Sequence, residues 1–391
     1  MSFEPSDRIA SLPTGIFAEL AAKKRAVAER GLSLIDLSVG SPDLPPAPFI
    51  RQVLAEAVLD GAKYEYTLSA IPGFAEAVAS FYQRRYDVSI DPSREVVQLM
   101  GSQDGLAHLA LALINPGDIV LVPDPGYPIY AASVQIAGGQ LVPMPLRSEH
   151  GFLPQFDAIP VDVARRAKFM VLNFPGNPIA TIAPPSFFEQ AIAFAKRHNI
   201  LIVHDFAYSE LVFDGLRATS ILAYPGATDV AIEFNSLSKT FNMAGCRIGY
   251  AVGNRQALSL LQQLKSHIDY GVFRPIQEAA IAALTADPVH LDEQVRIDER
   301  RRDTLVTGLR NADWQQVPNV HATMFIWAPI PSGFESSRAF SLDLLESSGV
   351  VVTPGDAFGR EGEGYVRIAL VQSEGLLAEA GQRIAAYLQR H

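Results

Sequence analysis

The sequence predicts an α/β fold: a doubly wound, mostly parallel sheet in a large domain, with a smaller α/β domain beside it. Short apolar segments alternate with helical ones through the middle of the chain. Strands that alternate with helices form parallel sheets. Two segments, Ile119–Val122 and Leu201–Val203, are unbroken aliphatic runs, as expected of parallel strands buried on both faces. The 391 residues exceed the usual size of one compact core.

The predicted strands share an apolar run bounded by turn-forming or polar residues. They cover residues 95–100, 118–123, 169–173, 200–205, 230–235 and 247–252. Amphipathic or apolar segments between them, such as residues 106–114 and 186–198, are predicted to be the crossover helices.

The pattern changes after Leu284. Asp287 and Pro288 are typical of a helix N-cap and first helical residue, so we predict a long, charged interdomain helix over residues 287–311. We interpret Arg300, Arg301 and Arg302 as its solvated face. Because the termini of one domain commonly lie close together, the predicted division is a large domain over 46–285 and a small domain of 1–45 plus 286–391.

Composition excludes several classes of protein. The formal net charge of −10 argues against a nucleic-acid-binding protein, which needs a basic face. One cysteine excludes an internal disulfide framework and fits a reducing compartment. Neither a signal-peptide pattern nor an apolar run of ~20 residues is evident, so we expect a cytoplasmic protein that binds no membrane. No spacing of His, Cys and Asp indicates a metal site.

The most informative segment is Ser236–Tyr250. Lys239 follows an apolar strand among small hydroxyl residues, where it is well placed to form a Schiff base with an aldehyde cofactor whose phosphate lies on Ser236 and Arg247. This segment resembles the lysine signature of the class I/II aminotransferases, pyridoxal-phosphate enzymes of fold type I. The resemblance implies that Lys239 is catalytic and that Ser236, Ser238, Lys239 and Arg247 bind the cofactor.

A second candidate for the phosphate is Gly101–Gly105, which includes Ser102 and Gln103. It follows a predicted strand and opens an apolar helix, and backbone N–H groups at a helix start bind anions. A plain strand-to-helix turn with a serine N-cap is the alternative.

Asp205 ends a predicted strand, at the edge where ligands bind in parallel sheets. The resemblance makes it the partner of the protonated ring nitrogen and makes Tyr208 a hydrogen-bond donor to the ring's phenolic oxygen. A helix N-cap is the alternative for Asp205.

Two proline-rich turns follow other predicted strands. Residues 173–178 read Asn-Phe-Pro-Gly-Asn-Pro, similar to a family motif whose last asparagine, here Asn177, contacts the phenolic oxygen and the substrate. In residues 124–130 the resemblance assigns Tyr127 to stacking on the pyridine ring. Core packing is the competing interpretation of Tyr127.

Arg367 alternates with the apolar residues of Val366–Leu370, and a guanidinium suits bidentate binding of a carboxylate. The resemblance assigns Arg367 and Gly40 to the amino-acid substrate. Taken alone, an exposed strand arginine and a tight-turn glycine would explain them.

The resemblance covers nearly the whole chain and implies a pyridoxal 5'-phosphate-dependent aminotransferase that moves an amino group between an L-amino acid and a 2-oxo acid. The glutamate/alanine and LL-diaminopimelate types look most similar. A C–S lyase on the same fold is the alternative, and a ligand-sensing regulator is a third reading.

The resemblance also implies a homodimer with a shared active site. In relatives a tyrosine reaches the neighbouring subunit's phosphate, and Tyr64 and Tyr66 are both candidates for it. Ala70, where relatives have glycine, and Cys246, where many have tryptophan, depart from the pattern. A side-chain carboxylate of the substrate would need a further cation, for which the candidates are Arg274 and Arg217.

Overall fold

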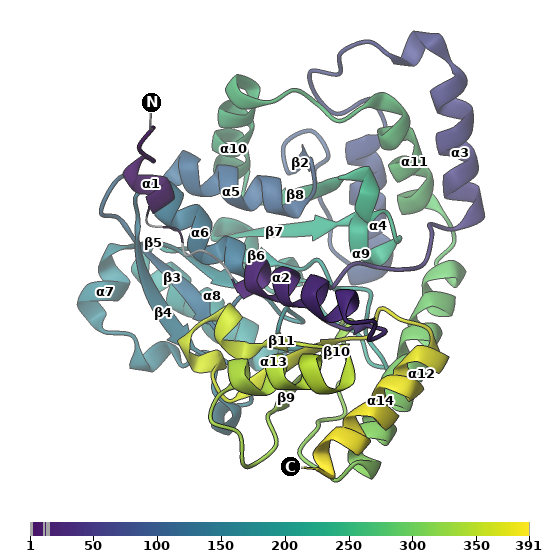
Figure 1. Ribbon diagram of the computed structural model, residues 1–391. Coiled ribbons are helices and arrows are strands. Elements are labelled where there is room, and N and C mark those ends of the chain that lie inside the picture. The colour runs from purple at the N-terminus through teal and green to yellow at the C-terminus, as the bar shows by residue number, and fades with distance from the viewer. Residues whose placement is uncertain (1–2, 11, 13–15, 391) are drawn as a thin grey trace.

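A seven-stranded sheet forms the centre of the computed structural model, which describes residues 3–10, 12 and 16–390 (Figure 1). Its strands all run parallel except β8, which pairs antiparallel with β2 and β7. In spatial order they are β2 (Val96–Leu99), β8 (Gly249–Gly253), β7 (Ala231–Ser236), β6 (Leu201–Asp205), β5 (Ala167–Leu172), β3 (Ile119–Asp124) and β4 (Gln140–Pro145). The predicted doubly wound, mostly parallel sheet is confirmed.

Two details of the sheet differ from the prediction. Strand β4 was missed because its two prolines, Pro143 and Pro145, are typical of turns. The strand tolerates these prolines because β4 lies at the edge of the sheet. Strand β8 begins at Gly249, two residues after the predicted start, because Arg247 adopts a left-handed conformation with a φ of 51° that ends the preceding turn.

Helices cover both faces of this sheet. Buried side chains of α5 (Ser102–Leu113), α6 (Pro128–Ile136) and α10 (Arg255–Ile268) share one hydrophobic cluster with one face. Those of α4 (Phe74–Tyr86), α8 (Pro185–His198) and α11 (Arg274–Thr285) share a second cluster with the other face. The further helices of this region are α3 (Pro48–Leu59), α7 (Val161–Arg166) and α9 (Leu237–Thr240).

The connections place a crevice between β3 and β5. Strand β3 continues through α6 on one face, whereas β5 continues through α8 on the other face. Where neighbouring parallel strands diverge in this way, their carboxyl ends leave an opening in which ligands bind. The residues that follow β3, β5, β6 and β7 therefore face one another.

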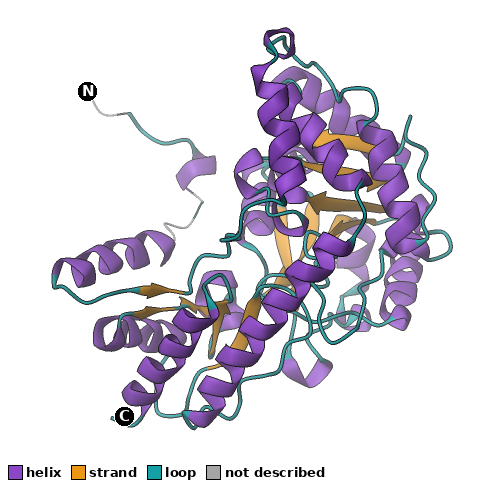
Figure 2. Ribbon diagram, turned by 90° about the vertical axis from the view of Figure 1, so that its right-hand side faces the viewer, coloured by secondary structure: helices purple, strands orange, loops and turns teal. Residues whose placement is uncertain are grey.

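Two smaller sheets lie beside the large one (Figure 2). Strands β9 (Phe325–Pro329), β11 (Thr353–Pro354) and β12 (Tyr365–Ala369) pair antiparallel, and β1 (Ile35–Asp36) pairs parallel with β10 (Val350–Val351). The surrounding helices are α2 (Ile16–Glu29), α12 (Val289–Asn311), α13 (Ser337–Ser348) and α14 (Glu374–Leu388). The chain begins with the short helix α1 (Asp7–Ala10). One cluster joins Ile35 and Leu37 to Trp314, Val350 and Ile384, which supports the predicted two-part small domain; the domain boundaries stay a prediction.

Helix α12 is the predicted long helix, and it begins at Val289, whose N–H donates to Asp287 Oδ1 at 3.0 Å. The interpretation of its arginines as a solvated face is wrong for two of them. Arg301 and Arg302 are only 5% and 2% exposed, because each forms an ion pair with a distant aspartate, and only Arg300 faces solvent. None of the described helices is long and apolar enough to cross a membrane.

Candidate active site

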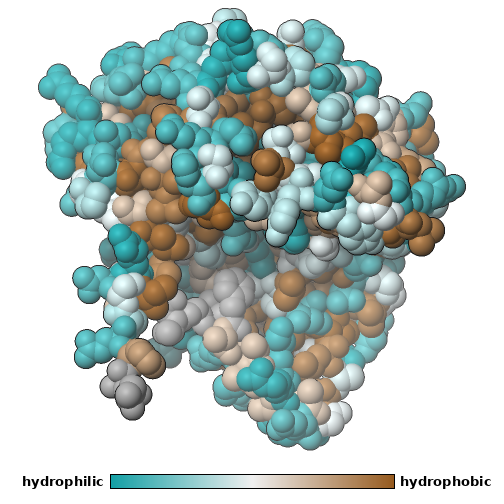
Figure 3. Space-filling model, turned by 90° about the horizontal axis from the view of Figure 1, so that it is seen from above, coloured by the Kyte–Doolittle hydropathy of each residue, from teal (hydrophilic) through white to brown (hydrophobic). Residues whose placement is uncertain are grey.

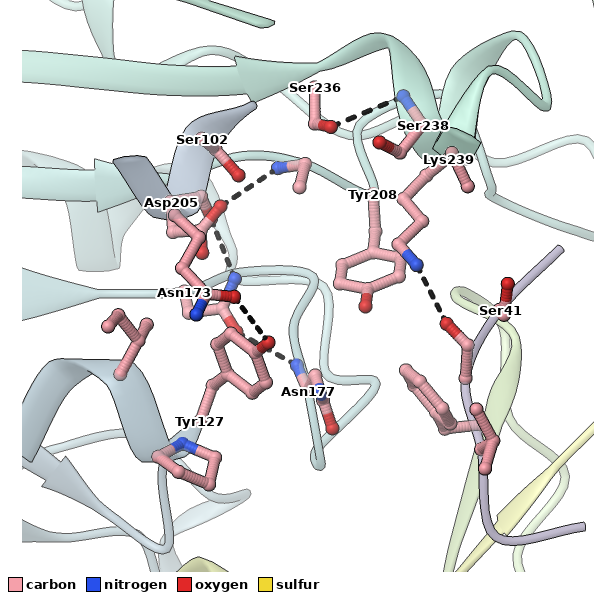
Figure 4. Close-up of a pocket in the computed structure, with 18 of the residues that line it drawn as sticks. Ser41, Ser102, Tyr127, Asn173, Asn177, Asp205, Tyr208, Ser236, Ser238 and Lys239 are labelled. Atoms are coloured by element: carbon pink, nitrogen blue, oxygen red, sulfur yellow. Dashed lines mark hydrogen bonds between the residues drawn. The ribbon is translucent and has the colours of Figure 1, made fainter. Parts of the chain in front are cut away.

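A cavity of about 750 Å³ opens at the carboxyl ends of the parallel strands. It brings together every predicted site residue except Tyr64, Tyr66 and the two candidate arginines, Arg217 and Arg274. Those in its lining are Gly40, Ser102, Gln103, Tyr127, Asn177, Asp205, Tyr208, Ser236, Ser238, Lys239, Arg247 and Arg367. Figure 4 shows the labelled side chains converging on this space from different strand ends.

Lys239 extends into the cavity from the single-turn helix α9 (Leu237–Thr240), which directly follows β7. Its Nζ donates a hydrogen bond to the carbonyl oxygen of Gly40 at 2.7 Å (Figure 4). Burial lowers the pKa of Lys239 to about 8, and the positive charges of Arg367 and Arg247 act in the same direction against the attraction of Asp205. An amine with this pKa is available both as a base and, once protonated, as an acid near neutral pH.

Asp205 is buried at the end of β6. Burial raises the pKa of its carboxyl group, while hydrogen bonds oppose that shift. Tyr130 OH donates to Oδ2 at 2.7 Å, and the N–H of Ala207 donates to Oδ1 at 3.3 Å. The carboxylate is therefore oriented and poised to stabilise a cation in the cavity. Sequence reasoning missed Tyr130, although its place in the turn that contains Tyr127 was a usable signal.

The proline-rich turn after β5 is tied to Asp205 through its first asparagine. Asn173 Nδ2 donates to the backbone oxygen of Asp205 at 2.7 Å, and Asn173 Oδ1 accepts from the N–H of Asn177 at 2.8 Å. Asn177 Oδ1 in turn accepts from Arg367 Nη1 at 2.8 Å. Asn173 thus fixes the position of Asn177, a role that sequence reasoning did not assign to it.

Arg367 lies on β12 and is buried, so the alternative of an exposed strand arginine is wrong. Its guanidinium lies 4.4 and 4.7 Å from the ring centroids of Phe325 and Phe358, and Nη2 donates to the Ser38 carbonyl at 2.6 Å. Desolvation lowers its pKa to about 10. Its hydrogen bonds among the described residues go to amide, carbonyl and hydroxyl oxygens and to no carboxylate, and its Nε has no hydrogen-bond partner. A buried cation in this state attracts an anionic ligand.

A second anion site lies where α5 begins. Gly101 has a φ of 84°, which favours glycine, and it lies against the Arg247 guanidinium; a Cβ at Gly249 would lie 2.6 Å from the Asn235 carbonyl oxygen and 3.1 Å from the nitrogen of Ser102. Ser236 Oγ accepts from the N–H of Ser238 at 3.2 Å, and the Ser238 hydroxyl is buried without a partner. A helix N-terminus, hydroxyl groups and a guanidinium together suit a phosphate group.

Two tyrosines complete the lining. Tyr127 OH donates to Gln103 Oε1 at 3.0 Å, and its ring contacts that of Tyr130 edge-on, so the ring is held at the cavity. The centroid of the Tyr208 ring is 6.0 Å from Lys239 Nζ. Burial raises the pKa of Tyr208, so its hydroxyl remains a hydrogen-bond donor at neutral pH.

Four predicted residues lie outside this cavity. Tyr64 and Tyr66 are 63% and 84% exposed on the segment between α3 and α4. Arg274 pairs with Glu278 on α11, and Arg217 is exposed. Neither arginine is placed to bind a substrate side chain within the cavity of this chain.

The residues present fit pyridoxal phosphate. The cavity holds a hydroxyl-rich anion site with Arg247, the oriented carboxylate of Asp205 and the deprotonatable amine of Lys239. The unpaired Ser238 hydroxyl supplies a donor for a phosphate oxygen.

Comparison with known proteins agrees with this chemistry. Residues 33–384 match the family model described as aminotransferase class I and II. The LL-diaminopimelate aminotransferase of Moorella thermoacetica is 44% identical over 97% of both chains, and that of Syntrophobacter fumaroxidans is 45% identical over 98% of this chain and 99% of its own. A substrate-bound structure of BacF from Bacillus subtilis is 40% identical, covers 99% of this chain and 98% of its own, and superposes with a TM-score of 0.94.

A family match across most of the sequence, relatives of this similarity over full length and a cavity of fitting chemistry lead to one conclusion. The chain belongs to the class I and II aminotransferases, with fold type I, and is a pyridoxal-phosphate-dependent enzyme.

Proposed function

We propose that LL-diaminopimelate is the amino donor and that Lys239 is the catalytic residue of transfer to a 2-oxo acid. The carrying observation is the position of the Lys239 amine in the cavity that also contains Asp205 and Arg367, with a pKa of about 8. When bound, the cofactor withdraws electrons from the bonds at the substrate α-carbon. Lys239 binds the cofactor. Its amine then removes the proton from the substrate α-carbon as a general base and donates it to a different reacting atom as a general acid.

The other residues bind and orient. Arg367 pairs with the substrate α-carboxylate, with Asn177 and Gly40 beside it, and Asp205 keeps the ring nitrogen protonated. Asn177 and Tyr208 donate to the phenolic oxygen, and Tyr127 lies on the ring face. The phosphate is held by Ser102, Gln103, Ser236, Ser238 and Arg247. Support comes from the shared cavity and the unpaired donors described above.

The choice of donor is supported by relatives that carry the name LL-diaminopimelate aminotransferase at 44–45% identity. The glutamate/alanine type is the second candidate. Because these names describe amino transfer, they favour a transaminase over the C–S lyase alternative.

A donor screen tests this proposal. The holoenzyme is mixed with each of the twenty amino acids and with LL- and meso-diaminopimelate, and absorbance reports conversion of the cofactor from its aldehyde form to its amine form. We expect the fastest conversion with the LL isomer and a slower one with the meso isomer, a matched control. Conversion by glutamate or alanine alone would overturn the donor assignment. Release of ammonia from a sulfur amino acid without an acceptor would favour the lyase.

We also propose a homodimer. Two segments form one exposed aromatic surface: the Tyr66 and Tyr270 ring centroids are 5.4 Å apart, and those of Tyr64 and Phe273 are 5.2 Å apart. All four are exposed, as is Leu68. The view from above shows hydrophobic residues exposed among polar ones on the upper face (Figure 3). Monomers seldom expose such a surface unless it binds a partner.

Light scattering at micromolar concentration tests the dimer, which predicts twice the 42.4 kDa chain mass. Tyr64→Phe and Tyr66→Phe then decide which hydroxyl reaches the neighbouring phosphate, because only one should weaken cofactor binding. A monomer, or unchanged affinity in both variants, would contradict the shared site. A reducing, cytoplasmic compartment is proposed from the single cysteine.

A further inference from the structure

Three cations hold the Ser38–Asp43 loop, which forms one wall of the cavity. Arg367 Nη2 donates to the Ser38 carbonyl at 2.6 Å, and Lys239 Nζ donates to the Gly40 carbonyl at 2.7 Å. Arg301 donates to both carboxylate oxygens of Asp43, at 2.8 and 2.7 Å. The loop is therefore fastened at its start, its middle and its end.

Two of these contacts involve groups that the reaction uses. In the function proposed above, the cofactor engages the Lys239 amine and the substrate carboxylate engages the Arg367 guanidinium. The Lys239 amine then loses its hydrogen bond to the Gly40 carbonyl, and the Arg367 guanidinium is shared between the Ser38 carbonyl and the substrate carboxylate. Arg301 does not line the cavity, so its contact with Asp43 is available at every stage.

Arg301 is built into its position. Its side chain is 6% exposed on α12, and besides Asp43 it lies 3.5 Å from Asp298 Oδ1 and 3.4 Å from the Leu370 carbonyl oxygen. A bidentate arginine–carboxylate pair is among the strongest and most directional polar contacts. With a sequence separation of 258 residues, it joins α12 to the loop directly.

The same helix also supports the residue that faces the loop. Gln294 Nε2 donates to the backbone oxygen of Lys239 at 3.3 Å and to Asn242 Oδ1 at 3.1 Å. Gln294, Asp298 and Arg301 have the spacing of one helix face. One face of α12 thus holds both the backbone of Lys239 and the loop opposite it.

We propose that Arg301 is a positioning residue. Through Asp43 it anchors the Ser38–Asp43 loop while the cofactor contacts Lys239 and the substrate contacts Arg367. The loop matters because Gly40 packs so closely on Phe325 that a Cβ at this position would collide with the ring. That ring also stacks on Arg367. Movement of the loop would therefore displace one wall of the site that binds the substrate carboxylate. We expect this displacement to weaken substrate binding more than it slows the chemical step.

Asp43→Asn and Arg301→Lys test the anchor, with Arg300→Gln, on the exposed neighbour that pairs with Glu374, as the control. Hydrogen exchange of the peptide covering residues 38–43 is measured without substrate. Loss of the bidentate pair should speed its exchange about tenfold. In the holoenzyme, KM for the donor should rise about tenfold while kcat changes less than twofold and cofactor affinity stays constant.

Unchanged exchange in Asp43→Asn would overturn the proposal, and so would faster exchange with an unchanged KM. Because Asp43 is one-third exposed, its replacement removes the ion pair even if the buried Arg301 variant fails to fold. Loop exchange does not depend on catalysis, so failure of the anchor and failure of the proposed function are distinguishable.

Discussion

The catalytic crevice and the arginine-bearing face of α12 both contain buried charges, yet they were not equally predictable. Most crevice residues end or closely follow a strand, in a motif whose neighbours already indicate the strand end. The arginines of α12 have only charged helical neighbours, and their partners Asp43 and Asp214 lie 258 and 88 residues away in the sequence. A functional residue in a local motif is recognisable, whereas a buried ion pair between distant segments is not.

The crevice side of this comparison depends most on Lys239. Lys239→Ala should slow amino transfer at least about ten-thousandfold, because it removes both covalent attachment and the proton-transferring amine. Single-turnover absorbance with the best donor measures the loss. Lys168→Ala, at an exposed lysine that pairs with Asp118, is the control and should retain full activity. A Lys239→Ala rate within tenfold of the wild type would refute the assignment.

The α12 side predicts a loss of stability instead. Arg302→Leu should lower the free energy of unfolding by about 3 kcal/mol, because Asp214 loses both of its bonds to the guanidinium and the Val320 carbonyl loses its donor from Arg302. Arg300→Gln should change it by no more than ~0.5 kcal/mol. Denaturant unfolding at one fixed protein concentration measures both. Equal losses of unfolding free energy in the two variants would mean that the burial of Arg302 adds nothing to its contribution to stability.

Asp298 sharpens the comparison through pH. Burial raises the pKa of its carboxyl to about 7, against the opposing charge of Arg301, while Asp43 adds to the increase. Because the folded pKa exceeds the unfolded value of 3.8, this group's contribution to stability is complete at low pH and is lost as pH rises through 7.

In the wild type, this group should lower the free energy of unfolding by about 2–3 kcal/mol between pH 5 and pH 8. Asp298→Asn should remove that decrease. Thermal or denaturant unfolding at both pH values measures it, with Asp303→Asn, on the exposed side of the helix, as the control. An identical pH dependence in wild type and Asp298→Asn would contradict the raised pKa.

The smallest expected effect belongs to Tyr130, the crevice residue that sequence reasoning missed. Its hydroxyl stabilises ionised Asp205, so Tyr130→Phe should raise the pKa of Asp205 further. The acid limb of the pH–rate profile then moves to higher pH, with a loss of roughly tenfold on that limb. Tyr224→Phe, outside the cavity, is the control. An acid limb at the same pH in Tyr130→Phe and the wild type would show that Tyr130 does not affect the ionisation of Asp205.

Much of the site followed from sequence because parallel strands share one carboxyl edge. Lys239, Asp205 and Asn177 each end or follow a different strand, so the fold class alone predicts that they meet. Tyr130 and Asn173 were missed because they act on other site residues, and a hydrogen bond to Asp205 leaves no mark on the local pattern. Strand β4 was missed because its prolines outweighed its edge position.

The sequence by itself determined the parallel sheet, the family resemblance and the candidate residues of the cavity, since periodicity and strand-end motifs are local properties. Only the tertiary structure decided that Arg367 is buried between two rings, that Arg301 and Arg302 leave solvent, and that three cations converge on the Ser38–Asp43 loop. The reason is physical: a charged side chain is buried only where it can contact a group of opposite charge or a hydrogen-bond acceptor. Those partners come from segments that only the folded chain brings together.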